Sequence, residues 1–179
     1  RFMEHLDLVE DSVTRNGGRS CVNASSVWTP SHGRDLADAL AQRFAEIEPR
    51  PMSDPAARLC GFSNPRVAEA INQTIEEGLR VAGAEDYTAR YRSGPRLIET
   101  GGTTFLLPTV IYCDSCDHPL ANREFLFPFV SVVEVPSEQA VQAAGETLVA
   151  SAIAANKGFV DNLAKRPEIS LLPGGPVAT

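Results

Sequence analysis

Helical and strand patterns alternate along most of this 179-residue chain, and this alternation limits the fold more than any other feature. Apolar residues at helical spacing favour helices, whereas short runs rich in β-branched residues favour strands. Strands that alternate with helices in this way form a largely parallel sheet. We therefore expect an α/β domain of three layers, in which a largely parallel sheet is flanked by helices.

The individual elements follow from the spacing of the apolar residues. Helices are predicted over residues 6–14, 33–47, 65–79, 138–144 and 157–165. Ser31 is the expected N-cap of the second helix, and Asn64 that of the third, whose apolar stripe consists of Val67, Ala70, Ile71, Ile75 and Leu79. Strands are predicted over residues 22–28, 97–99, 105–111, 129–135 and 147–153.

Length and charge narrow the class of protein. The length suits one domain, and we expect residues 1–179 to form a single one. A net charge of −7 disfavours binding to nucleic acid or to a membrane surface, because both attract clustered basic residues. No apolar run approaches the ~18 residues of a membrane span, and no signal peptide is visible. Four cysteines do not form a secreted disulfide framework, so we expect a cytoplasmic protein.

One cysteine lies in a run of small and flexible residues, Asn16-Gly17-Gly18-Arg19-Ser20-Cys21-Val22-Asn23-Ala24-Ser25. Adjacent glycines permit backbone conformations that other residues resist, and they let a substrate approach the main chain. A thiol in this setting is accessible and has backbone N–H groups beside it, as a nucleophile requires. Arg19 is expected to favour the thiolate by its charge. The alternative is that Cys21 is a small buried apolar residue.

Two segments of the chain together resemble motifs of the aldehyde dehydrogenase superfamily. The cysteine run is similar to the family's nucleophile motif Asn-x-Gly-Gln-x-Cys, with Arg19 in place of Gln. The segment 122–130 is similar to the family's Glu-Glu-x-Phe-Gly-Pro segment. There Glu124 and Pro128 match, whereas Leu126 and Phe127 replace the usual Phe and Gly. The resemblance extends over residues 7–136 and implies the fold of that family's catalytic domain.

The resemblance implies a site and a reaction. Cys21 corresponds to the nucleophile that attacks an aldehyde, with its own N–H as one donor to the oxyanion. Glu124 and Pro128 correspond to cofactor contacts, with Glu124 at the ribose of NAD or NADP. The adduct loses hydride and leaves a thioester, which water or coenzyme A cleaves. The reverse reaction, reduction of an acyl thioester, uses the same parts. No metal is implied, and the full enzyme is expected to be a homo-oligomer.

In the family, the cofactor-binding domain and the general-base glutamate precede the nucleophile. The resemblance therefore implies that both are absent from this chain, which would be the catalytic part of a larger enzyme and inactive alone. The alternative is a non-catalytic binding or assembly module that retains the fold. The departures at Arg19, Leu126 and Phe127 favour this alternative, because Phe127 in place of Gly would crowd the cofactor.

Two other motifs have the residue types of a functional site. Cys113-Asp114-Ser115-Cys116 has the spacing of a redox pair, so a small redox protein is a third hypothesis. A zinc site would need a second pair of ligands, and an ordinary loop is expected there. Gly101-Gly102-Thr103-Thr104 lacks the Lys and the spacing of a phosphate-binding loop, so it is expected to be a turn.

Overall fold

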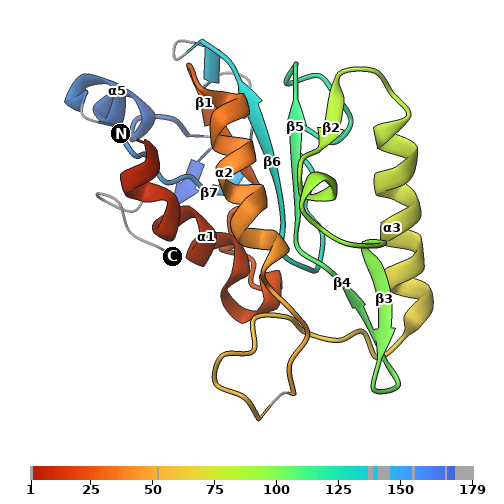
Figure 1. Ribbon diagram of the computed structural model, residues 1–179. Coiled ribbons are helices and arrows are strands. Elements are labelled where there is room, and N and C mark those ends of the chain that lie inside the picture. Colours follow the sequence, from red (N-terminus) through yellow and green to blue (C-terminus); the bar gives the residue numbers. More distant parts are fainter. Residues whose placement is uncertain are drawn as a thin grey trace.

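The computed structural model describes residues 2–51, 53–136, 139–140, 146–154, 156–167 and 169–171. Within these ranges a central sheet has helices on both faces (Figure 1). Strands β1 (Ser26–Thr29), β6 (Phe129–Glu134) and β5 (Thr109–Cys113) are parallel neighbours, and β2 (Ala84–Asp86) is antiparallel at the edge next to β5. The predicted α/β class with a largely parallel sheet is confirmed.

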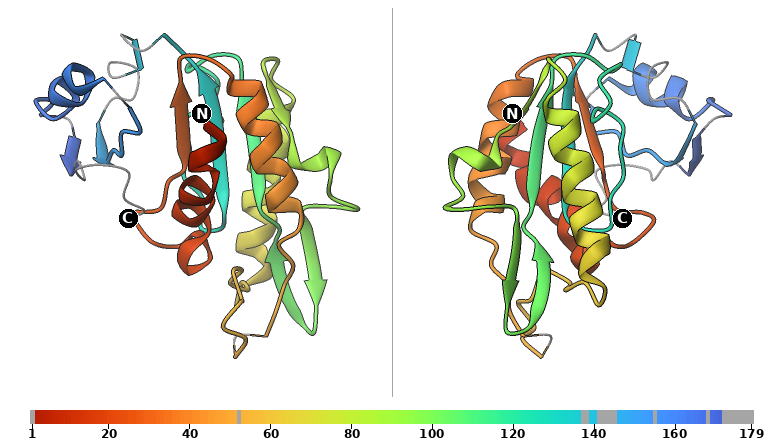
Figure 2. Two further views of the ribbon diagram at one scale, coloured as in Figure 1. Left: turned by 60° about the vertical axis from the view of Figure 1, so that its left-hand side comes forward. Right: turned by 90° about the vertical axis from the view of Figure 1, so that its right-hand side faces the viewer.

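Three helices cover the sheet. Helix α1 (Leu6–Thr14) packs beside α2 (Gly33–Ala45) on one face, and α3 (Pro65–Leu79) covers the other. The two views in Figure 2 show the orange α2 and the yellow-green α3 on opposite sides of the sheet. The three helices predicted first are confirmed, although the second ends at Ala45 instead of 47.

Alternate residues of the two central strands face opposite layers, as the pleat of a strand requires. Val110, Val130 and Val132 enter the core beneath α1 and α2, whereas Ile111 and Val133 enter the core beneath α3. All residues of β5 are buried, and so are all residues of β6 except its last. A strand that is covered on both faces has a nearly continuous apolar sequence. This run predicted β6 to within one residue, whereas β5 was predicted only in part, within a longer strand over 105–111.

The helix starts were predicted with mixed success. The Asn64 side chain accepts a hydrogen bond from the Arg66 N–H at 3.1 Å, so this N-cap is confirmed. The predicted Ser31 cap is wrong, because His32 is the residue before α2, in a left-handed conformation with φ 60°. The buried face of α3 also differs from the predicted apolar stripe. Ile75 is buried as predicted, but Val67 and Ala70 are exposed.

The strand predicted over 105–111 is two strands in two sheets. Pro108 has no N–H to donate to a ladder, and the chain leaves one sheet and enters the next at this point. The first part is β4 (Thr103–Leu106), which pairs with β3 (Leu97–Thr100) in a separate hairpin. Gly101 and Gly102 form its turn with φ of 57° and 72°, which suits a tight hairpin and confirms the predicted turn.

The remaining elements are short. Strand β7 (Thr147–Val149) pairs in parallel with β8 (Ile169–Leu171), and α5 (Lys157–Leu163) lies between them in sequence. Three 3-10 turns complete the description: η1 (Phe2–His5), η2 (Arg15–Gly18) and η3 (Thr88–Arg90). The helix predicted over 138–144, after Ser137, falls almost entirely outside the described residues. Among the described helices, none has the length and apolar character needed to cross a lipid bilayer.

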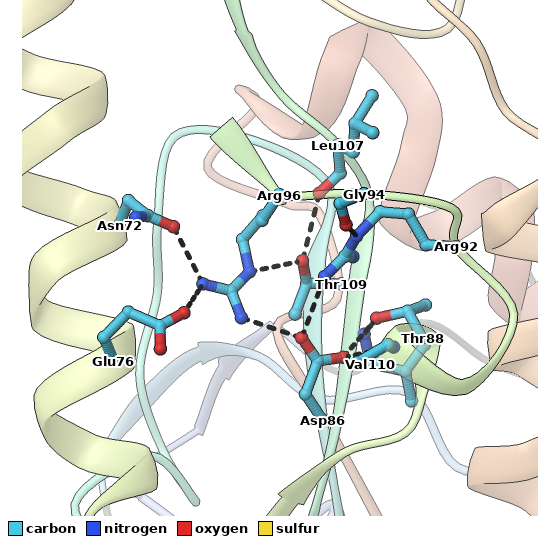
Figure 3. A network of polar contacts seen from close by, with 11 residues as sticks. Asn72, Glu76, Asp86, Thr88, Arg92, Gly94, Arg96, Leu107, Thr109 and Val110 are labelled. Carbon is cyan, nitrogen blue, oxygen red and sulfur yellow. Dashed lines mark hydrogen bonds and ion pairs between the residues drawn. The ribbon is translucent and has the colours of Figure 1, made fainter. Parts of the chain in front are cut away.

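A buried arginine fastens α3 to the sheet (Figure 3). The Arg96 guanidinium donates to Asn72 and Glu76 on α3, to Asp86 at the end of β2, and to Thr109 at the start of β5. Arg92 lies 3.2 Å from the same Asp86 carboxylate. This network joins three elements at the side of the sheet that carries β2 and β5.

Candidate active site

The two segments singled out from the sequence lie at the amino-terminal edge of the sheet. The cysteine run directly precedes β1, and the segment with Glu124 and Pro128 directly precedes β6. The two strands are parallel neighbours in which Ser26 lies beside Ser131, so the segments that precede them meet at one edge (Figure 1). This candidate site therefore consists of the loops that precede the two strands. It differs in place from the ligand sites of most open α/β sheets, which lie at the opposite, carboxyl edge.

The cysteine loop has an unusual backbone that requires its glycines. Asn16, Gly17 and Gly18 all have positive φ, at 54°, 64° and 70°. A β-carbon at Gly17 would collide with the Cys60 side chain, and one at Gly18 would collide with the peptide that joins Phe127 to Pro128. The adjacent glycines therefore serve both for conformation and for close approach to two segments that lie far away in the sequence.

Asn23 fixes the shape of the loop around Cys21. Its side-chain amide donates to the carbonyls of Ser12 at 2.8 Å and Arg15 at 3.0 Å, and its Oδ1 accepts from the Ser20 N–H at 2.7 Å. These bonds tie both sides of the loop to the end of α1. The sequence alone indicates no role for Asn23, although this residue type bonds readily to nearby backbone.

Cys21 is presented to solvent. Its thiol is free and the residue is exposed. Within the described part of the chain, neither the Cys21 thiol nor its backbone N–H has a hydrogen-bond partner. The alternative of a buried apolar cysteine is therefore wrong for Cys21. An accessible thiol with a free N–H on the same residue has the two features that addition to a carbonyl requires.

Glu124 and Pro128 differ in how they are presented. Glu124 is exposed, and among the described residues its carboxylate has neither an ion-pair nor a hydrogen-bond partner, so it is free to accept hydrogen bonds from a ligand. Pro128 is buried, and its carbonyl accepts from the Thr109 N–H at 3.0 Å. Pro128 thus holds this segment on β5, and Glu124 is the member that faces solvent.

Phe127 does not occupy the surface of the site. Its side chain is 2% exposed and belongs to the core beneath α3, with its ring 6.0 Å from that of Phe129. The expectation that this ring would crowd a cofactor is therefore not supported by its position. Leu126, its neighbour, is 54% exposed and is the apolar side chain that the segment presents to solvent.

Arg19 is directed toward carbonyl groups instead of the thiol. Its Nε donates to the Leu126 carbonyl at 3.1 Å, and its Nη2 donates to the carbonyls of Cys60 and Gly61, both at 3.0 Å. The guanidinium also lies over the Phe62 ring, 4.5 Å from the centroid. Cys60 and Phe62 are additional members of the site, and no local sequence signal marks them.

The C-x-x-C pair does not form a disulfide. Cys113 and Cys116 are both free, and Cys113 is buried in β5 with its Sγ 3.8 Å from the His118 Nδ1. Burial, with a smaller contribution from Asp114, raises the pKa of the Cys113 thiol to about 12. A thiol of this kind is a poor nucleophile at neutral pH, because the thiolate is the reactive form. Among the described residues, no group of three His, Cys, Asp or Glu side chains could hold a metal ion.

Comparison with known proteins gives a match in structure and none in sequence. No protein-family description and no curated protein sequence matches the chain. An aldehyde dehydrogenase mutant from Bacillus cereus superimposes with a TM-score of 0.77 at 19% identity, over 96% of this chain and 34% of that one. A gamma-glutamyl-gamma-aminobutyraldehyde dehydrogenase from Burkholderia cenocepacia gives 0.77 at 18% identity, over 99% and 36%. The NAD+ complex of the Bacillus cereus enzyme gives 0.74 at 20%, over 91% and 33%.

These similarities establish the fold of the chain. The described part of the chain has the fold of a segment of aldehyde dehydrogenases, which confirms the fold that the two motifs implied. The chain spans about a third of the length of the structures that it matches.

Proposed function

We propose that this chain supplies the nucleophile and a cofactor contact of an NAD(P)-dependent aldehyde dehydrogenase. The observation that carries the proposal is the meeting of two segments about a hundred residues apart. The loop of Cys21 and the segment of Glu124 lie together through Gly18 and Arg19, which both contact residues 126–128. In both segments a polar group of the site is exposed and has no partner among the described residues: the Cys21 thiol and the Glu124 carboxylate.

The reaction begins at the Cys21 sulfur. The thiolate adds to the carbonyl carbon of the aldehyde, and the Cys21 N–H, which has no other acceptor among the described residues, donates to the oxyanion that forms. Loss of hydride from the adduct carbon leaves a thioester on Cys21, and water or coenzyme A cleaves this thioester. A bound nicotinamide cofactor supplies the acceptor for the hydride.

Glu124 is a binding group in this proposal, and it takes no part in proton transfer. An exposed carboxylate without an ion-pair partner fits a ribose, because its two oxygens accept hydrogen bonds from neighbouring hydroxyl groups. Leu126 adds an exposed apolar surface beside it. We propose that the general base and most of the cofactor site come from outside these 179 residues, so that the chain alone is inactive or slow.

Thiol reactivity tests the role of Cys21 without a cofactor. Limiting iodoacetamide near neutral pH, read by peptide mass spectrometry, compares Cys21 with Cys60, Cys113 and Cys116. Exposure alone favours Cys21 in that comparison, so a second reagent is needed. Acetyl transfer from p-nitrophenyl acetate passes through an oxyanion, whereas alkylation by iodoacetamide does not. The ratio of the two rate constants at each cysteine therefore measures oxyanion stabilisation.

We expect the acetylation-to-alkylation ratio at Cys21 to exceed the ratio at the same residue in concentrated urea. One oriented donor accounts for roughly tenfold or more. Cys60 and Cys116 in the same sample are internal controls, and Cys21→Ser shows which acetyl signal belongs to Cys21. A ratio at Cys21 that is the same in the folded and the unfolded chain would contradict the proposal, since the loop would then be only exposed.

A further inference from the structure

We propose that Arg19 is a positioning residue that acts as a clamp. It holds the loop of Cys21 against two distant segments, one with Cys60 and Gly61 and the other with Leu126. This inference rests on the proposed function, because it concerns how the nucleophile is held. It differs from the electrostatic role that the sequence suggests. In the structure the Arg19 guanidinium donates hydrogen bonds to three backbone carbonyl oxygens. Arg19 is neither the proposed nucleophile nor the proposed ribose contact.

Three consecutive residues of the loop contact the same two segments. Gly17 lies against Cys60, and Gly18 lies against the peptide between Phe127 and Pro128. Arg19 then donates to Cys60 and Gly61 on the first segment and to Leu126 on the second. The backbone contacts of the two glycines and the hydrogen bonds of Arg19 thus hold the loop against the same two segments. Because both kinds of contact agree, we interpret the contact between the loop and these segments as a specific one.

The partners of Arg19 are backbone carbonyls, and this decides what the residue can do. A carbonyl acceptor is present whatever side chain its residue carries, and three acceptors on two segments need the planar fork of a guanidinium. The Cys60 thiol adds a further contact, since its Sγ lies 3.7 Å from the Asn16 carbonyl on the underside of the loop. Loss of these hydrogen bonds would let the loop move away from residues 60–61 and would expose the Cys60 thiol further to solvent.

The replacements Arg19→Lys and Arg19→Gln separate a clamp from a charge. Lys keeps the positive charge but cannot reach three carbonyls in the fork geometry, whereas Gln removes the charge and keeps one donor group. If Arg19 acts as a clamp, both replacements should increase the alkylation of Cys60 to a similar extent. If its charge acts on the thiolate, Lys should preserve the pH midpoint of Cys21 alkylation and Gln should shift it.

The experiment uses iodoacetamide on the whole chain, from pH 6 to pH 10, with labelling measured at each cysteine. We expect alkylation of Cys60 to rise roughly threefold to tenfold in both Arg19 variants, as expected when about one net hydrogen bond is lost from a locally opening loop. The pH midpoint of Cys21 alkylation stays at its wild-type value in both. Arg15→Gln is the matched control, because Arg15 begins the turn that precedes Arg19 and its guanidinium pairs, among the described residues, only with Asp11. We expect this variant to leave the labelling of Cys60 unchanged.

Cys113 reports whether the effect is local. This thiol is fully buried in β5, away from the loop, and it becomes labelled only when the domain opens. A parallel rise at Cys113, full rescue by Lys, a shifted midpoint at Cys21 or an equal effect of Arg15→Gln would each overturn the clamp. The proposed function fails separately, through the acetylation ratio of wild-type Cys21, which the Cys60 response does not affect.

Discussion

Arg96 and Asp86 form an ion pair inside the protein, with the Arg96 Nη2 2.7 Å from the Asp86 Oδ2 and side chains only 2% and 8% exposed. Burial alone would raise the pKa of Asp86. The hydrogen bond from Thr88 and the charges of Arg96 and Arg92 outweigh burial and hold this pKa below its usual range. The pair therefore makes the stability of the domain depend on pH.

Asp86→Asn should remove this dependence. A carboxyl whose pKa is lower in the folded state adds stability above about pH 4, and the contribution is lost as the pH falls through the folded-state pKa. We expect the variant to lose roughly 3–5 kcal/mol at pH 7, since two buried guanidinium groups lose the carboxylate that they share. The loss should be smaller at pH 3. Urea unfolding at both pH values checks this, with exposed Asp117→Asn as the control, and an equal loss at both would contradict it.

Gly18→Ala should destabilise the protein more than Gly101→Ala. Both glycines have positive φ. A β-carbon at Gly18 would collide with the peptide before Pro128, whereas a β-carbon at Gly101 would meet no atom within 4 Å outside its two chain neighbours. Gly101→Ala is expected to cost about 1 kcal/mol for backbone strain, and Gly18→Ala several-fold more because neighbouring backbone must shift. Thermal melting of the two variants gives the comparison. Equal melting temperatures would contradict the close contact between Gly18 and the peptide that joins Phe127 to Pro128.

Asn23→Asp should be destabilising, and increasingly so as the pH rises from about 4 to 7. The hydrogen bonds that the Asn23 amide donates to the Ser12, Val13 and Arg15 carbonyls are replaced by a carboxylate oxygen that faces the same carbonyls. The folded state then favours the protonated acid, so stability is retained below the unfolded-state pKa and lost above it. We expect a loss of roughly 1–3 kcal/mol at pH 7. Asn64→Asp is the matched control, because Asn64 only accepts as an N-cap and Asp replaces it well.

Phe127→Ala and Leu126→Ala should separate a core residue from a surface residue. Phe127 is 2% exposed and should cost roughly 3–5 kcal/mol, the range for a buried aromatic ring. Leu126 is 54% exposed and should leave the free energy of unfolding within about 0.5 kcal/mol. Denaturant titration measures both. A small cost at Phe127 would show that its ring is not held in the core and would restore the argument that it crowds the cofactor.

The sequence predicts the local parts of this fold because they depend on neighbouring residues. The helix predicted over 6–14, the Asn64 cap and the Gly101-Gly102 turn each depend on residues within a few positions of one another. The break at Pro108 was equally local, and the missing N–H of proline was a sufficient reason to divide that strand. The left-handed conformation of His32 has only a weak local signal, because positive φ is uncommon for any residue other than glycine, even though His adopts it more often than most.

The residues proposed for the site were chosen from sequence motifs, and their assignment stays a prediction, whereas the contacts around them come from the structure alone. Cys21 and Glu124 stood out through motifs, and both are exposed as a site requires. The roles of Arg19 and Cys60 depend on contacts between residues 41 to 107 positions apart, which one sequence does not reveal. Arg19 was therefore assigned an effect on its near neighbour in sequence, whereas its contacts are with distant segments.

The pairing of β1 with β6 has a consequence for how the protein is made. Ser26 and Ser131 share a hydrogen bond although 105 positions separate them, so β1 finds its neighbour only after most of the chain has been synthesised. The loop that ends at β1 depends on the same late partner, through residues 126–128. Cys21 therefore leaves the ribosome before residues 126–128 have been made, and its surroundings form only when these distant segments have met.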